Sequence, residues 1–552
     1  MLARRTAHIF EGRDWRWFAA AGLLVIVLAA PFALVDVPPV LDYPNHLARY
    51  FVLAHPDDPI LSLMYAPHWG IQPNLGMDIL GAAMLRMTDA YIGVYAGGKI
   101  LLALSLFAPV IGVMAYHRVA FGRASYWPLG AGLVAYNGVF FLGFMNFLLS
   151  LGLALIAGAG WIALRRRNFL LTRIAAGALA TAVIFFCHIL GTVLFAVLIG
   201  ADEASLLWKR LSSGSLKSKD LAGAAGTVAA ALSPAVILYC LSPLNARADS
   251  VGDWRGIAKI WRILTPFMTT SAELTLATAL AVVALLILFR RQLTFAPGVP
   301  LALAGLVLAF VACPSSMKGG AFIDMRFALM IALLLFAGIQ PSLSTREAML
   351  ASVVVAALIM LRSGYVATSW LEHRHDLADL RAAIAHVQPG ARVLAARGHP
   401  GDQADLQPAN RALPGIYRLD GHLAGLLVIE RRAFWPLLFA DPAQQPLAVR
   451  PPFDRIAEPM SEPVEWQWIA QDTLPAEALQ RAPYLEQWQR KFDDVLLIDR
   501  PATTQSSAAL SPVYRGSYAE LYRIDHKADP ASVESHAEAT GGAGPKPTTA
   551  EE

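Results

Sequence analysis

Long apolar runs separated by short polar segments occupy the chain as far as about residue 365. A membrane-spanning helix needs about 20 mostly apolar residues, and eleven stretches come close to this requirement. They lie at 17–36, 91–116, 126–142, 146–164, 173–188, 189–207, 221–241, 273–289, 297–313, 326–341 and 348–365. Two longer apolar stretches are divided at 143–146 and at 187–188, where turn-prone or polar residues interrupt them. The pattern predicts an α-helical polytopic membrane protein with about eleven transmembrane helices.

Basic residues test this count, because Lys and Arg favour short cytoplasmic loops. With the N-terminus inside, the dense basic clusters all fall on the inner side. They are Arg4, Arg5, Arg13 and Arg16; Arg118 and Arg123; Arg165, Arg166, Arg167 and Arg173; Lys209, Arg210, Lys217 and Lys219; Arg290, Arg291 and Arg346. A missed helix would scatter these clusters over both faces. We therefore expect a cytoplasmic N-terminal segment, 1–16, and a multi-pass location in a bacterial inner membrane.

An odd number of crossings places everything after about Tyr365 on the outer, periplasmic side. "HDLADLRAAIAHV" has the period of an amphipathic helix, and "ARVLAAR" and "SYAELYRID" are typical of strands. "YLEQWQRKFDDVLLIDRP" indicates a helix followed by a strand. The sequence thus predicts a transmembrane domain over 17–365 and an extracytoplasmic α/β domain over 366–528. The composition of 529–552, rich in Ala, Glu, Gly, Pro and Thr, predicts a disordered tail.

Composition agrees with this picture and excludes some functions. The chain is 56% hydrophobic and 16% charged, whereas soluble domains carry roughly 25% charged residues. The net charge of +4 is too small to argue for a nucleic-acid partner. The three cysteines lie in apolar runs without metal-ligand spacing. The chain contains no Walker A motif, which argues against ATP-driven transport.

Candidate chemistry gathers in "LDYPNHLAR", near the start of a predicted outer loop at 37–90. The loop places Asp42, Asn45, His46 and Arg49 close together. Asp42 and His46 are four residues apart, as are Asn45 and Arg49, so each pair shares a face of a helix. Asp42 either caps an interfacial helix or serves as a catalytic carboxylate. A capping loop can also hold a catalytic group, so the sequence leaves both interpretations open.

The whole layout resembles the GT-C superfamily of membrane glycosyltransferases. The shared features are a large outer loop after the first helix, an acid near its start, the polytopic body and an outer α/β domain, with Asp42 as the residue-level anchor. The resemblance implies a polyprenyl-phosphate-linked sugar donor, with Asp42 as base or metal ligand and His46 supporting the catalysis. Many members carry paired acids where this chain has "LDYPNH". Whether a divalent cation such as Mg²⁺ or Mn²⁺ binds at Asp42 therefore stays open.

Glycosyl transfer requires a base and a group that stabilises the departing phosphate. Because a lipid-linked donor holds its phosphate at headgroup level, polar residues near the outer helix ends are candidates for substrate binding. They are Asn45, Arg49, Asn74, Asp78, Lys99, His188, Asp324 and Arg326. Structural alternatives remain, such as helix caps for Asn74 and Asp78 and an interfacial anchor for Arg326 paired with Asp324. Asp57 and Asp58 offer a second acid or a solvated turn.

These observations favour a glycosyltransferase that moves a sugar from a polyprenyl-phosphate donor to an envelope acceptor on the periplasmic face. The acceptor class, whether glycan, lipid or protein, is not defined by the sequence, and membrane lipid is the expected surrounding partner. A transporter or flippase of a lipid-linked or small solute is one alternative, although the chain lacks the two matched halves common in transporters. A non-catalytic envelope assembly protein is the other.

Overall fold

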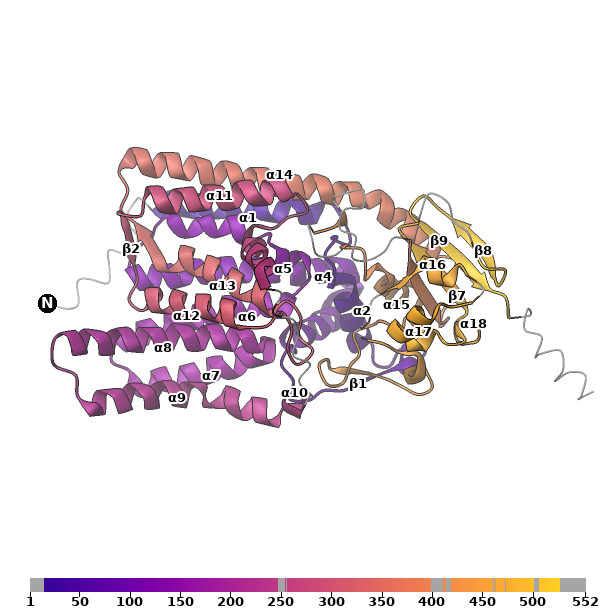
Figure 1. The fold of residues 1–552 in the computed structure, drawn as a ribbon, viewed down its shortest axis with the longest axis horizontal. Helices are drawn as coiled ribbons and strands as arrows, with labels where there is room; N and C mark the ends of the chain where they lie inside the picture. The colour runs from indigo at the N-terminus through magenta and orange to yellow at the C-terminus, as the bar shows by residue number, and fades with distance from the viewer. Residues whose placement is uncertain are drawn as a thin grey trace, which may run out of the picture.

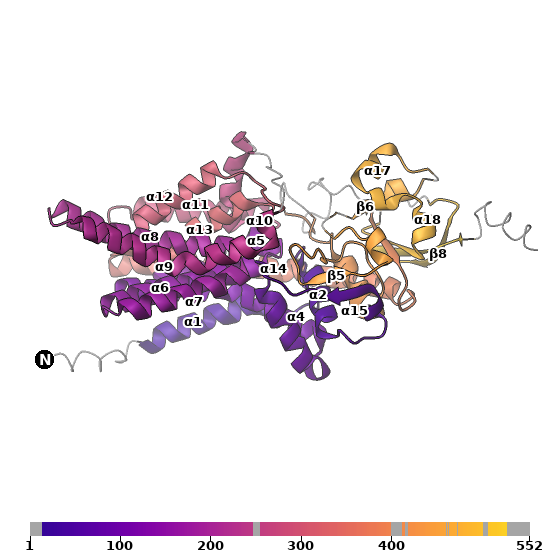
Figure 2. The ribbon, with the colours of Figure 1, turned by 90° about the horizontal axis from the view of Figure 1, so that it is seen from below.

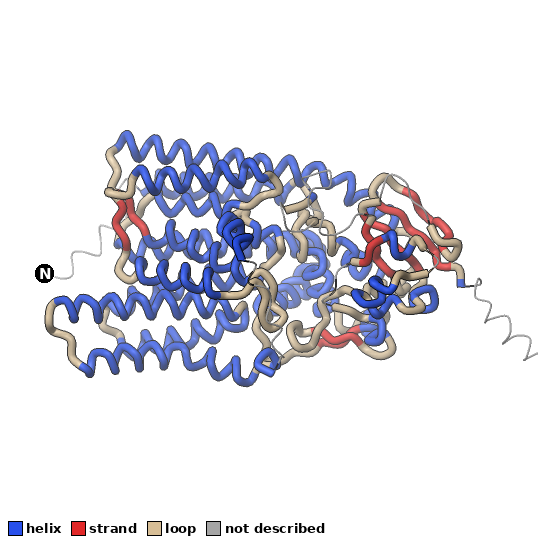
Figure 3. Tube along the Cα trace, viewed as in Figure 1, coloured by secondary structure: helices blue, strands red, loops and turns tan. Residues whose placement is uncertain are grey.

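The computed structural model describes residues 14–246, 254, 256–398, 411–413, 418–459, 461, 463–471, 473–500 and 506–526. The predicted disordered tail and most of the predicted cytoplasmic segment lie outside these residues. A bundle of long helices forms one end of the molecule, and a smaller domain containing a β-sheet forms the other (Figure 1). Helices dominate the bundle and the longest strands lie in the smaller domain (Figure 3).

Seven described helices are long and apolar enough to cross a membrane, or eight if one bent pair counts as a single crossing. This confirms the prediction of a multi-pass helical membrane protein. The bundle consists of α1 (Asp14–Ala29) with η1 (Ala30–Ala33), α4 (Gly76–Phe121), α6 (Met145–Arg166), α7 (Leu170–Cys187), α8 (Ile189–Ser212), α9 (Ser218–Leu241), the bent pair η3 (Gly256–Phe267) and α11 (Ala272–Leu288), α12 (Val299–Ala312), α13 (Ile323–Gly338) and α14 (Thr345–Ile384).

Both predicted divisions of the long apolar stretches are confirmed. Helix α6 begins at Met145, and His188 separates α7 from α8. The predicted span at 126–142 is wrong, because this segment forms the 3-10 helix η2 (Trp127–Val134) and the short helix α5 (Gly138–Phe141). Most of the segment is buried, so its apolar character reflects contact with neighbouring helices rather than with lipid. The predicted helices at 348–365 and in "HDLADLRAAIAHV" are parts of the single helix α14.

Shorter elements fill the predicted outer loop and the turns of the bundle. They are α2 (Tyr43–Ala54), α3 (Leu61–Met64), β1 (Tyr65–Pro67), α10 (Pro243–Ala246), β2 (Leu293–Phe295) and β3 (Ile339–Pro341). Helix α2 lies between the bundle and the smaller domain, next to α15 (Leu426–Arg431) (Figure 2). Helix α4 changes direction at Gly93, whose φ of 75° is non-helical, so its first half lies apart from the segment within the bundle.

The C-terminal domain has a mixed five-stranded sheet with the order β6-β4-β7-β9-β8. Its elements are β4 (Val393–Arg397), η5 (Leu423–Gly425), α15 (Leu426–Arg431), β5 (Leu447–Val449), η6 (Phe453–Ile456), β6 (Val464–Glu465), α16 (Trp466–Ile469), α17 (Ala476–Arg481), η7 (Pro483–Leu485), α18 (Trp488–Lys491), β7 (Asp494–Ile498), β8 (Leu510–Arg515) and β9 (Ala519–Ile524). Strand β4 is parallel to β6 and β7, and β9 is antiparallel to β7 and β8. The predicted strands in "ARVLAAR" and "SYAELYRID" are confirmed as β4 and β9.

The outer loop and the C-terminal domain are joined by a separate pair of strands. Strand β1 of the loop pairs antiparallel with β5 of the domain, with Tyr65 opposite Val449. Two flanking backbone bonds extend this contact, from the His68 amide to the Pro446 carbonyl at 2.8 Å and from the Arg450 amide to the Met64 carbonyl at 2.7 Å. The loop after the first helix is therefore held to the domain at the far end of the sequence.

Small residues allow α4 and α6 to approach closely inside the bundle. A Cβ atom on Gly152 would lie 2.4 Å from the backbone carbonyl of Ala108, and one on Gly112 would lie 2.8 Å from the Gly152 oxygen. Close helix contact through small residues is a common way of packing in membranes, where hydrophobicity does not drive helices together. Any side chain at position 152 must therefore separate the two helices.

We predict that Gly152→Val lowers the stability of the purified protein by at least about 1–3 kcal/mol, the usual cost of overpacking. Gly160→Val is the matched control, because Gly160 lies in the same helix and a Cβ added there would meet nothing within 4 Å. Thermal unfolding in detergent measures both variants. Equal melting temperatures for the two would show that the α4–α6 contact does not depend on Gly152.

Candidate active site

The position of Asp42 is set by the turn between α5 and α6. The Leu41 amide donates to the Phe141 carbonyl at 2.9 Å, and the Asp42 amide donates to the Leu142 carbonyl at 3.3 Å. Gly143 follows with a φ of 86°, and a Cβ there would lie 2.8 Å from the Asp42 nitrogen. Only glycine meets both the conformation and the close approach, so Gly143 is required to place Asp42.

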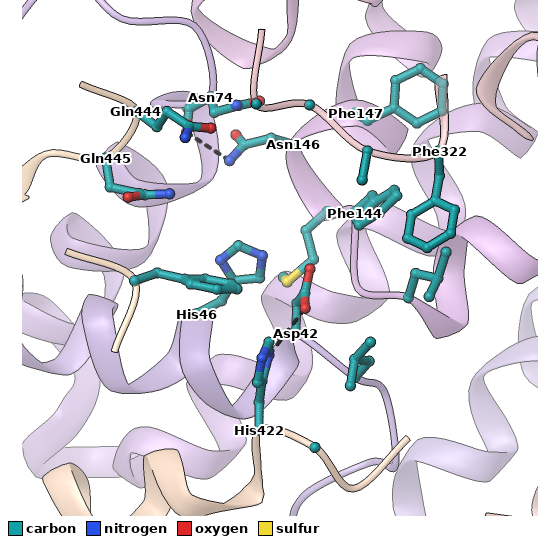
Figure 4. Close-up of a pocket in the computed structure, with 18 of the residues that line it drawn as sticks. Asp42, His46, Asn74, Phe144, Asn146, Phe147, Phe322, His422, Gln444 and Gln445 are labelled. Atoms are coloured by element: carbon teal, nitrogen blue, oxygen red, sulfur yellow. Dashed lines mark hydrogen bonds and ion pairs between the residues drawn. The ribbon is translucent and has the colours of Figure 1, made fainter. Parts of the chain in front are cut away.

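Asp42 occupies the N-cap position of α2, yet its side chain makes no capping hydrogen bond. Its Oδ1 atom instead lies 3.1 Å from Nδ1 of His422, a residue of the C-terminal domain. Figure 4 shows this pair side by side at the cavity, with His46 next to them. The contact has ion-pair distance without hydrogen-bond alignment. The carboxylate is therefore directed to a partner other than its own helix, against the capping interpretation.

Asp42 faces a cavity of about 290 Å³ that three parts of the chain build together. The outer loop and α2 contribute Asp42, His46, Arg49 and Asn74; the bundle contributes Phe144, Asn146, Phe147, His188, Phe322 and Arg326; the C-terminal domain contributes Arg397, Arg418, His422, Phe439, Gln444 and Gln445. Aromatic side chains gather on one side and the two glutamines on another (Figure 4). Six of the predicted site residues thus meet at one cavity.

Arg326 brings a buried positive charge to this cavity. Its guanidinium carbon lies 4.3 Å from the centre of the Phe144 ring and 5.4 Å from that of Phe147. Within the described part of the chain, Arg326 has no carboxylate at ion-pair distance, and its buried Nε has no hydrogen-bond partner. Its charge still interacts favourably with Asp42. An uncompensated buried charge is costly, so this arrangement suits the binding of an anion.

His188 does not supply the missing acceptor. Its Nδ1 accepts a hydrogen bond from the Leu190 amide at 3.0 Å and so caps α8. A neutral imidazole accepts at one nitrogen only, so Nε2 carries the hydrogen. Nη1 of Arg326 lies 2.5 Å from this Nε2, which places two donors against each other. Nδ1 of His188 therefore has a structural role as a helix cap. Its Nε2 does not accept a hydrogen bond from Arg326.

His46 is held in place by a buried ion pair beneath the cavity. Arg49 donates from Nε to Oδ1 of Asp78 at 2.6 Å and from Nη2 to Oδ2 at 3.1 Å. The same Nη2 lies 3.0 Å from Nδ1 of His46. Burial lowers the pKa of His46 well below its usual value, and the nearby Arg49 and His422 lower it further. A neutral His46 with its accepting nitrogen engaged orients the site rather than removing a proton.

Four predicted substrate-binding residues do not line the cavity. Asp78 is committed to Arg49, and the Lys99 ammonium donates to the carbonyls of Phe32 and Val35 at 3.2 and 3.1 Å. Asp324 accepts from the Ser315 hydroxyl at 3.1 Å. The remaining residue, Asn45, bonds the C-terminal domain. All four hold structural contacts outside this cavity, and their role in substrate binding stays a prediction.

Asn74 and Asp58, two further candidates from the sequence, both make local structural contacts. Asn74 does line the cavity, where its carbonyl accepts from Asn146 at 2.7 Å, while Asn146 accepts from the Met77 amide at the start of α4. Asp58 accepts from the amides of Ile60 and Leu61 at 3.0 Å and pairs with Arg432. Asp58 therefore stabilises a turn, as the structural alternative predicted, and does not join Asp42.

Sequence reasoning missed the contribution of the C-terminal domain. His422 contacts Asp42, and Arg418 lies buried at the cavity, where Nη2 pairs with Asp420 at 3.1 Å and with Asp499 at 2.5 Å. Among the described residues, the other terminal nitrogen of Arg418 has no hydrogen-bond partner. No local spacing connects these residues to "LDYPNHLAR". The charged and aromatic side chains of "YRLDGHLAG" were the one available signal.

A resident divalent metal does not fit the described residues. Mg²⁺ and Mn²⁺ prefer several oxygen ligands, and Asp42 is the one carboxylate among the lining residues. In the part of the chain that the structure describes, no group of three or more His, Cys, Asp and Glu side chains is placed to hold a metal ion. We derive no catalytic step from a metal.

No protein-family model and no curated protein matches this chain. Among solved structures, it is similar to ArnT from Cupriavidus metallidurans bound to undecaprenyl phosphate, with 12% identity and a TM-score of 0.47. It is also similar to the same protein in the apo state, with 12% identity and a TM-score of 0.49. Both alignments cover 94% of this chain and 100% of the other. Likeness of this degree assigns neither a family, a substrate nor a reaction to this chain.

The low pKa of His46 predicts a loss of stability in acid. Below the ordinary histidine pKa of about 6.5, the unfolded chain binds a proton that native His46 does not, costing up to about 1.4 kcal/mol per pH unit. We expect His46→Gln to reduce the dependence of the unfolding midpoint on pH between 7.5 and 5.5. His68→Gln, at an exposed position of the same loop, is the control. Identical pH slopes for wild type and His46→Gln would contradict the expectation.

Proposed function

We propose that this protein is a membrane glycosyltransferase that moves a sugar from a polyprenyl-phosphate donor to a hydroxyl group of an envelope acceptor. The observation that carries the proposal is the pairing of two groups across one cavity. The Asp42 carboxylate is released from helix capping, and Arg326 is a buried cation without a carboxylate partner among the described residues. A base and an anion-binding group are the two requirements of this transfer.

Arg326 is the group that binds the donor phosphate. It lies in the first turn of α13 at the cavity, with the rings of Phe144 and Phe147 against its guanidinium. The aromatic rings exclude water, which strengthens the attraction between the guanidinium and a phosphate oxygen. As the sugar–phosphate bond breaks, negative charge grows on the leaving oxygen, and Arg326 stabilises that charge without rearranging.

Asp42 is the base for the acceptor. The acceptor oxygen attacks the anomeric carbon, the bond from that carbon to the phosphate oxygen breaks, and the acceptor proton passes to the carboxylate. The polyprenyl phosphate leaves as an anion. His422, with Nδ1 at 3.1 Å from Oδ1 of Asp42, lies against the carboxylate and limits the positions that it can take. His46 and Arg49 position α2 beneath both groups.

The arrangement of the chain supports reaction on the periplasmic face of the bacterial inner membrane. The described N-terminus and the turn between α8 and α9 lie at one end of the bundle, and α2 and the C-terminal domain lie towards the other (Figure 1). Of the predicted inner basic residues, Lys209 and Arg210 lie in the last turn of α8 and therefore at the first end. Transporter sites commonly lie near the bilayer midplane, whereas this charged cluster lies where the bundle meets the domain, which favours a transferase.

Asp42→Asn is expected to lower the rate of sugar transfer by about 10²- to 10⁴-fold, the usual contribution of a general base. The measurement is transfer from a panel of undecaprenyl-phosphate sugars by purified protein. Asp57→Asn is the matched control, because Asp57 is an acid of the same loop that does not line the cavity. Equal turnover by wild type and Asp42→Asn would remove Asp42 from the reaction. No transfer by wild type with any of these donors would overturn the proposed function.

Arg326→Gln is expected to weaken the binding of undecaprenyl phosphate by at least about tenfold, since a hydrogen bond to a charged group contributes about 1.5–3 kcal/mol. Binding to detergent-purified protein measures this without any sugar transfer. Arg346→Gln serves as the control, because Arg346 is exposed in the first turn of α14. Unchanged affinity in Arg326→Gln would show that the phosphate is held elsewhere.

A further inference from the structure

A second cavity of about 310 Å³ in the C-terminal domain continues from the candidate active site. Arg397, Ser461 and Pro463 line both cavities. The residues that line the second cavity alone are Val464, Glu465, Trp468, Arg481 and Ala482. The shared residues make the two cavities neighbours, so a molecule that occupies the second cavity reaches toward the first.

The strand order places this second cavity where α/β sheets commonly bind ligands. Strand β4 lies between β6 and β7, both parallel to it, and the chain reaches them on opposite sides of β4. In open α/β sheets, ligands bind outside the carboxyl ends of the parallel strands. Arg397 is the last residue of β4 and lies opposite Glu465, the last residue of β6. Both side chains line the cavity.

The lining of the second cavity differs from that of the donor side. Phenylalanine rings surround Arg326, whereas Ser461, Glu465 and Arg481 supply hydroxyl, carboxylate and guanidinium groups beside the indole of Trp468. A sugar ring presents hydroxyl groups around its edge and an apolar C–H face. The carboxylate accepts from hydroxyl groups, the guanidinium donates to them, and the indole offers a flat apolar surface. This combination suits a saccharide better than a lipid chain.

Arg481 is able to turn toward such a ligand at little cost. Its Nη2 lies 2.9 Å from Oε1 of Glu477, one helical turn earlier, and both side chains are more than half exposed, at 64% and 63%. Exposed pairs of this kind contribute about 0–1 kcal/mol. A bound sugar hydroxyl competes easily with that partner. Glu477 itself does not line the cavity.

We propose that the second cavity binds a saccharide unit of the acceptor and directs its hydroxyl group toward Asp42. This inference rests on the proposed glycosyl transfer and names the acceptor as a glycan or a glycan-bearing molecule. The donor phosphate occupies the Arg326 side of the site, and the acceptor enters from the C-terminal domain. The two substrates then meet at the Asp42–His422 pair from opposite sides.

Binding of the full-length protein in detergent to an array of defined bacterial oligosaccharides tests the site without any transfer. Wild type is expected to bind at least one array saccharide. Arg481→Ala is expected to weaken that binding by about tenfold or more, while Glu477→Ala, which breaks the same surface ion pair, leaves it within about twofold. Absence of binding by wild type, or equal losses in the two variants, would overturn the proposal.

Ser461→Phe separates this inference from the proposed function. A phenyl ring at this shared position fills space where the two cavities meet. If Ser461→Phe fails to fold, the Arg481→Ala experiment still tests the site. Slow hydrolysis of the undecaprenyl-phosphate sugar is expected to persist in Ser461→Phe, whereas transfer to the bound saccharide is lost. Retained transfer would overturn the acceptor site alone. If wild type shows neither hydrolysis nor transfer, the proposed function is overturned. The saccharide-binding experiment then tests the second cavity independently.

Discussion

The candidate active site exists only because the C-terminal domain is fastened to α2, and the side chain of Asn45 makes the central contact. Its amide nitrogen donates to the Leu437 carbonyl at 2.9 Å, and its amide oxygen accepts from the Phe439 amide at 2.7 Å. Asn45 is fully buried, so loss of these bonds would leave backbone groups unsatisfied at about 1–3 kcal/mol each. This contact places His422 of the domain next to Asp42 and Phe439 next to His46.

Close backbone packing on both sides keeps this junction in register. Gly143 lies against the backbone of Asp42, and a Cβ on Gly425 would lie 2.9 Å from the Pro44 carbonyl oxygen. Asp42 and the start of α2 are thus held between the bundle and the domain at fixed separations. A site that spans a membrane surface needs such support, since a displacement of about 1 Å in a reacting group can cost about 10²-fold in rate.

The cavity retains polar groups that its own residues do not satisfy. Arg326 faces the protonated nitrogen of His188, and Arg418 keeps one buried donor without a partner among the described residues. Natural proteins break the rule of buried polar satisfaction mainly at functional sites, where a substrate completes the network. Arg49, also buried, is paired with Asp78 and likewise keeps one nitrogen, Nη1, without a hydrogen-bond partner among the described residues. Arg326 differs from both, because it has no carboxylate at ion-pair distance among the described residues, and it is the residue proposed to bind the donor phosphate.

Hydropathy by itself determined the helical body, because a segment that crosses lipid must form all its backbone hydrogen bonds within itself. It also determined the divisions near Gly143 and His188 and the placement of Asp42 and Arg326 near helix ends. The predicted span at 126–142 was wrong, because the hydropathy of an apolar segment is the same whether lipid or protein surrounds it. Sequence reasoning also gave no sign of the contacts of Lys99, Asp78 and Asp324, whose partners are found only in three dimensions. The tertiary structure alone decided that His422 meets Asp42, because that contact depends on the docking of two segments at opposite ends of the chain.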